Sequence, residues 1–341
     1  LNGPVPLRWS RHYRSSFSGG WSCIANEVIH VSKGWVNYCR EDGLVIAFEL
    51  PPIGKYATNV TCGLTLQRIF HSVFVIKGAG DTQRVFSGLY STTLPKGSVA
   101  EETIPLTQLR NQHSEGWYFY HRDADHKHLA SDRSQLVAIK SNWGCEIVIE
   151  WNAAGYITRV VNRNDGKVLA QYVWGSDGLL SAVSDTKRRS QYTYLSGNSS
   201  LITSMISANG SHTCWEYDDQ EQVQKSRIES KENALQRQRY SYDKNHLLTT
   251  CIDIEENVTQ YRYNAEGMLT AFIDPAGGGF SLSYDDQGRV QEVTNALGES
   301  WGCEYNKHGA IESLVDPEGV AYRINCVTGR PVSIFADAKP L

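Results

Sequence analysis

The densest group of side chains that could do chemistry lies between His121 and His128. The string His-Arg-Asp-Ala-Asp-His-Lys-His gathers imidazoles and carboxylates within eight residues, and both are ligands for divalent metals. His126 and His128 would point to the same side of a strand. The string also follows an apolar run, Trp117–Tyr120, and fits the solvated polar tip of a hairpin. We favour the hairpin tip, with a metal site as the alternative.

Two Asp-Pro pairs, at Asp274 and Asp316, offer carboxylates that could form a catalytic acid–base pair. The two aspartates are separated by two periods of 21 residues, and this phase places them in equivalent turns. We therefore expect each aspartate to accept hydrogen bonds from backbone amides of its own turn. The chain contains no G-x-S-x-G, H-E-x-x-H, P-loop or dinucleotide motif. The sequence thus predicts no catalytic, cofactor-binding or metal-binding residue, and no enzyme.

The cysteines are widely scattered and include no C-x-x-C pair, which argues against a thiolate metal site. We expect reduced thiols that act as small hydrophobic side chains and folding in the cytoplasm, since a disulfide framework needs an oxidising compartment. Similar strings, Trp143-Gly-Cys-Glu and Trp301-Gly-Cys-Glu, place two of them in predicted strands. The eight are Cys23, Cys39, Cys62, Cys145, Cys214, Cys251, Cys303 and Cys326.

Length and charge narrow the class of protein further. A chain of 341 residues with 40% hydrophobic residues can bury a sizeable core. The net charge of −4 argues against a dedicated nucleic-acid binder. No apolar run approaches the ~18 residues of a membrane span, and no signal peptide is recognisable. Because the sequence starts at Leu1, we expect a piece of something longer.

Tyrosines at a fixed interval organise the second half of the chain. Each follows the last by 21 residues and precedes an Asp or Asn, and in three copies a glycine stands four residues later. A second motif keeps the same phase in the form Asp-Pro-x-Gly or Asn-x-x-Gly. A constant period of this length is the signature of a repeat architecture. The repeat positions are Tyr242, Tyr263, Tyr284 and Tyr305, then Gly267, Gly288 and Gly309, and then Asp274, Asn295 and Asp316.

The residues of one repeat predict a β-hairpin. Asp-Pro-x-Gly supplies a proline with φ preset for a turn and a glycine that accepts positive φ. Tyr-Asp-x-x-Gly does the same at the opposite end. Between the turns, runs such as residues 279–284 and 288–294 alternate apolar and polar side chains with period two. A lone hairpin is marginal in water, so the repeats must stack on one another.

This pattern resembles the YD repeat of Rhs proteins, the polymorphic toxins of bacteria, and of teneurins and insecticidal toxin-complex components. The match is specific over 242–319 and continues upstream in degraded copies at Trp151, Trp174 and Tyr217. The glycine is lost at Glu221 and His246, and the copy around Tyr194 is weak. We expect irregular hairpins or bulges at these places.

The N-terminal string Gly3-Pro-Val-Pro-Leu-Arg-Trp-Ser-Arg-His-Tyr, with Gly20-Trp-Ser further on, resembles the segment that precedes the YD repeats in Rhs proteins. After it, residues 35–38, 44–50, 72–77 and 116–121 read as strands, and alternation resumes over 134–151. Residues 91–112, with Pro95 and Pro105, read as a long loop or a short helix.

The predicted fold is all-β: antiparallel hairpin repeats that form a continuous curved sheet. We divide it into an N-terminal Rhs-associated β region at 1–133 and a YD-repeat sheet at 134–341, continuous with the first. The resemblance implies that the sheet is part of a β-cocoon shell.

The resemblance also implies a function. It is that of a non-catalytic shell segment of a polymorphic toxin, which encloses a C-terminal toxin domain for delivery in interbacterial competition, commonly by type VI secretion. The implied partners are the remaining shell, the toxin cargo and a secretion spike or adaptor, with the chain in the bacterial cytoplasm before delivery outside the cell. The alternative is a surface adhesion or carbohydrate-binding β-repeat protein, since tyrosine rows can bind sugars as well as pack.

Overall fold

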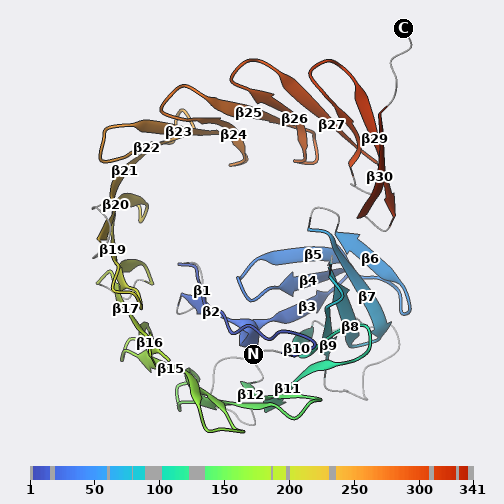
Figure 1. Ribbon diagram of the computed structural model, residues 1–341, viewed down its shortest axis with the longest axis vertical. Coiled ribbons are helices and arrows are strands. Elements are labelled where there is room, and N and C mark those ends of the chain that lie inside the picture. Colours follow the sequence, from blue (N-terminus) through green and yellow to red (C-terminus); the bar gives the residue numbers. More distant parts are fainter. Residues whose placement is uncertain are drawn as a thin grey trace. The chain divides into compact units, whose positions relative to one another are not determined.

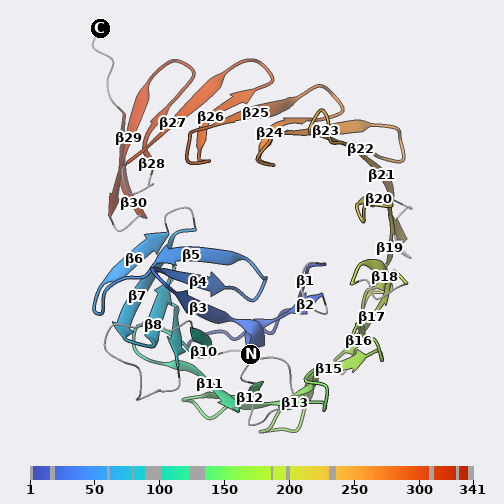
Figure 2. The same ribbon diagram turned by 180° about the vertical axis from the view of Figure 1, so that it is seen from behind.

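The computed structural model describes residues 3–15, 20–59, 62–78, 80–88, 102–122, 135–185, 187–196, 200–229, 236–306, 311–327 and 330–336. The chain divides into two compact units, unit 1 (Leu1–Ile202) and unit 2 (Thr203–Leu341). Apart from one short 3₁₀ turn, η1 (Ile24–Asn26), the regular elements of the described residues are β-strands. Figure 1 shows the order of the elements in colour along the chain, and Figure 2 shows them from behind. No helix of the described part is long and apolar enough to cross a membrane.

Unit 1 begins with short strands that pair in sequence order and then joins a longer antiparallel row. Strand β3 pairs with both β4 and β10, and β10 also pairs with β9 and β11. The first strands are β1 (His12–Tyr13), β2 (Trp21–Ser22), β3 (Val28–Ser32), β4 (Trp35–Cys39), β5 (Val45–Glu49), β6 (Tyr56–Asn59), β7 (Leu64–Phe70), β8 (Val73–Lys77) and β9 (Gln83–Ser87). Those that follow are β10 (Glu102–Arg110), β11 (Gly116–Arg122), β12 (Gln135–Ser141), β13 (Glu146–Trp151), β14 (Ile157–Asn162), β15 (Val168–Trp174), β16 (Leu180–Ser184) and β17 (Arg189–Tyr194).

The loop or helix predicted over 91–112 is wrong for its second half. Residues 102–110 form strand β10, whose Ile104 and Leu106 are fully buried on one face. Pro105 lies within the strand, opposite Val28 of β3. We took proline as a breaker, but a strand tolerates it where its missing N–H breaks no essential ladder bond. Residues 91–101 lie outside the described residues.

Unit 2 is a row of antiparallel strands in which each strand pairs with the next along the chain. Both views show its hairpins lying side by side in one curved row. The strands are β18 (Ile202–Ile206), which starts at the unit boundary, then β19 (His212–Tyr217), β20 (Val223–Glu229), β21 (Gln236–Asp243), β22 (Leu248–Ile252), β23 (Val258–Tyr263), β24 (Leu269–Ile273), β25 (Gly279–Tyr284), β26 (Val290–Asn295), β27 (Ser300–Tyr305), β28 (Ile311–Val315), β29 (Ala321–Val327) and β30 (Arg330–Ala336).

The turns of unit 2 contain the side-chain hydrogen bonds that their residues predict. In the turn after β25, Asp285 Oδ1 accepts from the amides of Gln287 and Arg289, and Gly288 takes φ 74°. At the other end of the repeat, Asp274 Oδ1 accepts from the amides of Ala276 and Gly278. The side chain therefore replaces hydrogen bonds that the reversing backbone would otherwise leave open.

Loss of the glycine has different results at the two positions that we singled out. At Glu221 the predicted irregularity lies in the strands, as a register shift between Glu216 and Tyr217. The turn itself keeps its standard form, because Glu221 adopts φ 62° and its amide donates to the Asp218 carbonyl at 3.1 Å. At His246 the loop is longer, because Asp243 pairs directly with Leu248 and Leu247 takes φ 50°.

The predicted all-β chain of antiparallel hairpin repeats is confirmed. In unit 1, β10 pairs with β11, β11 with β12 and β12 with β13. The predicted division at residue 133 falls within 123–134, outside the described residues, and stays a prediction.

Candidate functional site

Three of the repeated tyrosines close the open ends of their hairpins with a hydrogen bond. Tyr284 lies at the end of β25, and its hydroxyl donates to the carbonyl of Leu269, the first residue of β24, at 2.6 Å. Tyr305 makes the same bond to Val290, the first residue of β26, at 2.7 Å. Tyr242 donates to Val223, the first residue of β20, at 2.8 Å. The repeated tyrosine thus ties one turn of the sheet edge to the neighbouring turn.

Tryptophan does the same task in the degraded upstream copies. Trp174 Nε1 donates to the carbonyl of Ile157, the first residue of β14, at 2.7 Å. Trp151 Nε1 donates to Leu136 in β12 at 2.8 Å. An indole N–H and a phenol O–H are both amphipathic donors at the end of a large ring. This explains how the motif survives there without its tyrosine.

The strand register places the repeated tyrosines on one face of the unit 2 sheet, together with most of its other rings. Tyr261 lies opposite Phe272, and Phe272 lies opposite Phe280. Leu282 lies opposite Val293, and Val293 lies opposite Trp301. We call this surface the tyrosine face. Its members include Tyr240, Tyr242, Tyr261, Tyr263, Phe272, Phe280, Leu282, Tyr284, Val293, Trp301 and Tyr305.

The opposite surface, the polar face, carries alternate residues of the same strands. Ser283 lies opposite Glu292, and Glu304 lies opposite Ser313. The hydroxyls of Thr294 and Ser300 lie 2.7 Å apart across β26 and β27. Such alternation is typical of a sheet with one wet face.

The rings of the tyrosine face contact one another across the strands. The ring centroids of Tyr261 and Phe272 are 5.5 Å apart, as are those of Phe272 and Phe280. The Arg289 guanidinium lies 4.4 Å from the centre of the Tyr305 ring and 2.6 Å from the Asp285 carboxylate. Each ring pair contributes about 0.5–1.5 kcal/mol beyond the area that it buries.

The apolar side chains of the repeat strands are buried to different extents in the two units. In unit 1 the repeat strands bury Ile147, Val160 and Leu180 almost completely. Among the described residues, every large apolar side chain that is buried lies at or before Ile202. On the tyrosine face of unit 2, Phe280 remains 38% exposed and Trp301 40% exposed. The apolar side chains of the repeat strands are therefore buried in unit 1, whereas in unit 2 some of them remain exposed to solvent.

In unit 1 an N-terminal segment provides part of the cover. We call residues 3–15 and 20–22 the strap. Trp9 Nε1 donates to the Tyr172 hydroxyl of β15 at 2.6 Å, and Trp21 Nε1 donates to the Tyr194 hydroxyl of β17 at 2.8 Å. Burial raises the pKa of both tyrosines to about 12, so both hydroxyls stay neutral.

Further contacts hold the strap along its length. The Tyr13 hydroxyl donates to the Ser200 carbonyl at 2.5 Å and accepts from the Ile202 amide at 3.0 Å. The Trp21 ring centre lies 4.7 Å from that of Tyr192. At the start of the strap, Gly3 lies so close to Trp143 that an added Cβ would sit 2.3 Å from the indole ring.

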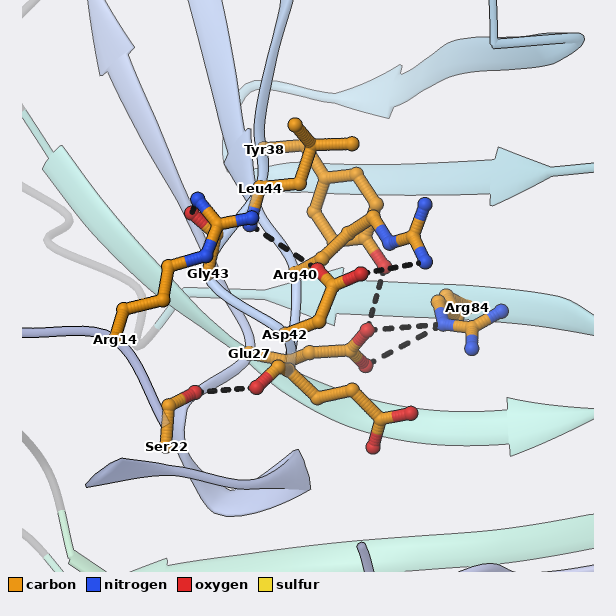
Figure 3. A network of polar contacts seen from close by, with 10 residues as sticks. Arg14, Ser22, Glu27, Tyr38, Arg40, Asp42, Gly43, Leu44 and Arg84 are labelled. Carbon is orange, nitrogen blue, oxygen red and sulfur yellow. Dashed lines mark hydrogen bonds and ion pairs between the residues drawn. The ribbon is translucent and has the colours of Figure 1, made fainter. Parts of the chain in front are cut away.

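A buried polar cluster lies beside the strap in unit 1 (Figure 3). Glu27 is 1% exposed, and its carboxylate accepts from the Tyr38 hydroxyl at 2.5 Å and from Arg84 Nε at 3.2 and 3.3 Å. Burial raises the pKa of the Glu27 carboxyl, while the Arg84 guanidinium opposes this shift. Nearby, Arg40 pairs with Asp42 at 2.9 Å. Because these partners come from β4 and β9, the contacts tie strands together.

The other residues that could do chemistry do not converge. His121 belongs to β11, and its Nε2 lies 2.8 Å from the Leu106 carbonyl, whereas His126 and His128 lie outside the described residues. Asp274 and Asp316 each serve their own turn, since Asp316 Oδ1 accepts from the Val320 amide at 2.7 Å. Gly309 also lies outside the described residues. No group of three His, Cys, Asp or Glu side chains suited to a metal is found in the described part of the chain.

The expectation of buried thiols holds for only one described cysteine. Cys23 is buried, and burial raises its pKa to about 12. Cys62 is exposed and the others are half-buried. Cys145 lies in the turn before β13 and not in a strand, whereas Cys303 lies in β27 as predicted. Among the cysteines whose side chains the structure describes, none forms a disulfide.

The family comparison bears on the repeats directly. The Teneurin YD-shell family model matches residues 221–322, which contain the stapled tyrosines of β21, β25 and β27. Residues 221–322 are therefore similar to the YD-shell of teneurins. The match covers less than half of the chain, and no match was found among curated proteins.

Several solved structures of Tc toxin proteins are also similar. The TcdB2–TccC3 complex with Cdc42 has a TM-score of 0.44 and 11% identity, covering 89% of this chain and 19% of that one. TcdB2–TccC3 without its hypervariable C-terminal region has a TM-score of 0.42 and 9% identity, with 97% and 21% covered. A Tc holotoxin pore of Photorhabdus luminescens has a TM-score of 0.33 and 9% identity, with 98% and 22% covered. The chain thus spans about a fifth of the length of these proteins.

Proposed function

We propose that this chain is a non-catalytic wall segment of an Rhs-type shell, which encloses a C-terminal toxin domain until it is delivered to competing bacteria. Its tyrosine face is the surface that lies against the enclosed protein or against further shell. Its partners are then the remaining shell, the toxin cargo and a secretion spike or adaptor. The producing cell would hold the assembly in its cytoplasm and deliver it by type VI secretion.

One observation carries this proposal: the contrast in burial between equivalent surfaces. The repeat strands of unit 1 bury their apolar side chains under other parts of the chain, while Phe280 and Trp301 of unit 2 remain more than a third exposed. Apolar surface of this kind marks a contact site on a soluble protein. A wall with one wet face and one apolar face needs a second layer on the apolar side.

Photo-crosslinking from adjacent positions of β25 tests the proposal. Leu282 lies on the tyrosine face and Ser283 on the polar face, so the two sites differ by one residue but face opposite ways. A photoreactive phenylalanine analogue is placed at either position in the full natural polypeptide. Crosslinks from position 282 to the toxin segment or to other shell strands, and none from position 283, are expected. Equal crosslinking from both positions, or crosslinks from 283 alone, would refute it.

Exposed rings favour the second candidate, a carbohydrate-binding or adhesive sheet, because Trp301 and Phe280 could stack against sugars. A glycan array with the Trp301→Ala variant separates the two. The shell proposal expects no glycan binding that depends on Trp301.

Hydrolysis of nucleic acid, sugar or NAD by the purified chain would contradict the non-catalytic role.

A further inference from the structure

The sulfur of Cys214 has polar neighbours suited to thiol chemistry. Its Sγ lies 3.3 Å from Nε2 of His212, two residues earlier on the same strand, β19. Nη2 of Arg227, on β20, donates to the same sulfur at 3.7 Å. The three side chains lie on the polar face of unit 2, opposite the surface assigned to enclosed protein.

The strand register fixes this arrangement. Cys214 lies directly opposite Arg227, and His212 lies directly opposite Glu229. The Glu229 carboxylate holds Arg227 Nε at 3.2 Å, which orients the guanidinium beside the sulfur. The pKa of the Arg227 guanidinium is raised, first by its contact with Cys214 and then by Glu229.

The remaining charged groups around the site leave it positive. Glu216, next along the same face of β19, pairs with Lys225 of β20 at 2.8 Å. Arg237 of β21 lies opposite Arg227. On the other side, Ser204 of β18 lies opposite Cys214 and carries no charge. Two carboxylates therefore face three cations, before any charge on His212.

We propose that Cys214 is a nucleophilic modification site for soft electrophiles, with His212 as the base and Arg227 as the cation that stabilises the thiolate. A thiolate is the reactive form of cysteine, and nearby cations and a histidine favour it. With iodoacetamide, the Cys214 thiol gives its proton to His212 Nε2. The sulfur then forms a bond to the methylene carbon as the carbon–iodine bond breaks and iodide leaves, and the imidazolium returns its proton to water.

Five other described thiols provide the comparison for Cys214. Burial raises the pKa of Cys23 to about 12 and also raises the pKa values of Cys145, Cys251 and Cys303, which keeps those thiols protonated. Cys62 is exposed, and no charged side chain of a described residue contacts its sulfur. Exposure alone predicts that Cys62 reacts first, whereas the cluster predicts that Cys214 does.

Site-resolved alkylation decides between these outcomes. The reduced, folded chain is treated with limiting iodoacetamide at pH 7, and the label on each cysteine peptide is followed by mass spectrometry. We expect Cys214 to react about tenfold faster than Cys62. His212→Gln and Arg227→Gln should each lower the Cys214 rate several-fold and leave the Cys62 rate unchanged, which also shows that the fold is intact.

Two conservative variants make the test specific. Arg227→Lys keeps a cation and should retain most of the Cys214 rate, while Lys225→Gln removes a cation that is engaged by Glu216 and should change it little. A Cys62 rate equal to or above that of Cys214 would overturn the proposal. So would a Cys214 rate that both His212→Gln and Arg227→Gln leave unchanged.

Discussion

A single donor atom at the end of a large ring recurs as the tie between neighbouring turns. It is a phenol hydroxyl in Tyr284 and Tyr305 and an indole N–H in Trp151 and Trp174. The acceptor is each time a carbonyl at the start of the preceding strand. A hydrogen bond of this kind contributes about 0.5–1.5 kcal/mol to stability.

Tyr284→Phe should therefore lower the free energy of unfolding of unit 2 by about 1 kcal/mol, because it removes only the donor to Leu269. Tyr261→Phe is the matched control, since the Tyr261 hydroxyl makes no hydrogen bond to a described residue although its ring lies on the same face. Urea unfolding followed by tyrosine and tryptophan fluorescence gives both values. Equal losses in the two variants would contradict the role of the hydroxyl.

Glu221→Gly should stabilise unit 2, by about 0.5 kcal/mol. Glu221 holds φ 62°, which strains a side chain with a Cβ, and relief of that strain outweighs the greater freedom of glycine in the unfolded chain. The reverse exchange, Gly288→Ala at φ 74°, should destabilise by about 1 kcal/mol. Its added Cβ would lie 3.5 Å from Met268 Sδ, an ordinary contact, so strain alone accounts for the loss. A lower urea midpoint for Glu221→Gly would refute this account.

The turn aspartates predict a loss of stability in acid. Hydrogen bonds from the Arg289 side chain and amide hold the pKa of Asp285 below its ordinary value of 3.8. The charged carboxylate thus stabilises the folded turn above that value, and its contribution disappears as the pH falls through the lower folded-state pKa.

Asp285→Asn should therefore lose less stability than the natural chain between pH 7 and pH 3, because asparagine already serves the equivalent turns at Asn264 and Asn295. Asp286→Asn is the control, since the Asp286 carboxylate makes no hydrogen bond to a described residue. Urea midpoints at both pH values check this. The same acid loss in all three proteins would count against it.

At the scale of elements, the strap packs against repeat strands of unit 1 and so distinguishes them from the exposed repeat strands of unit 2. Its tryptophans reach tyrosine hydroxyls of β15 and β17, more than 160 residues along the chain. The strap fills the apolar side of the early repeats with its own rings, and unit 1 has buried tyrosines as a result. Docking of the strap thus belongs to the fold of unit 1.

Trp21→Phe should weaken unit 1 by about 1 kcal/mol, because the ring contact with Tyr192 remains while the bond to the Tyr194 hydroxyl is lost. Trp35→Phe, at a residue that is 50% exposed, is the control and should change little. Limited proteolysis within the first 22 residues reports the strap directly. Unchanged cleavage in Trp21→Phe would show that the hydrogen bond does not hold it.

The sequence predicts those elements that are specified by residues close together along the chain. The 21-residue period of Tyr242 to Tyr305 places turns and strands correctly, because an Asx side chain and a glycine decide a turn within five residues. Strand β10 was missed because Pro105 suggested a break. The bond of Trp9 to Tyr172 and the group around Cys214 were missed for another reason. Both depend on strand register or on contacts across the whole of unit 1, which no local pattern encodes.

At the scale of the whole molecule, unit 2 contributes a sheet of hairpin repeats with one polar face and one aromatic face. The repeats supply stability through several equivalent hydrogen bonds, each of about 1 kcal/mol. Such a molecule is suited to forming a wall. In the proposed function, the tyrosine face of unit 2 is covered from outside that unit.

Hydroxyl-radical footprinting of Trp301 and Phe280 tests this claim most directly. Both rings are about two-fifths exposed in the chain, so both should be oxidised readily when the chain is alone. In the assembly with the remaining shell and toxin segment, their oxidation should fall several-fold, while Tyr56, which is 63% exposed in unit 1, serves as the reference. Equal oxidation of Trp301 and Phe280 in the two samples would contradict the account.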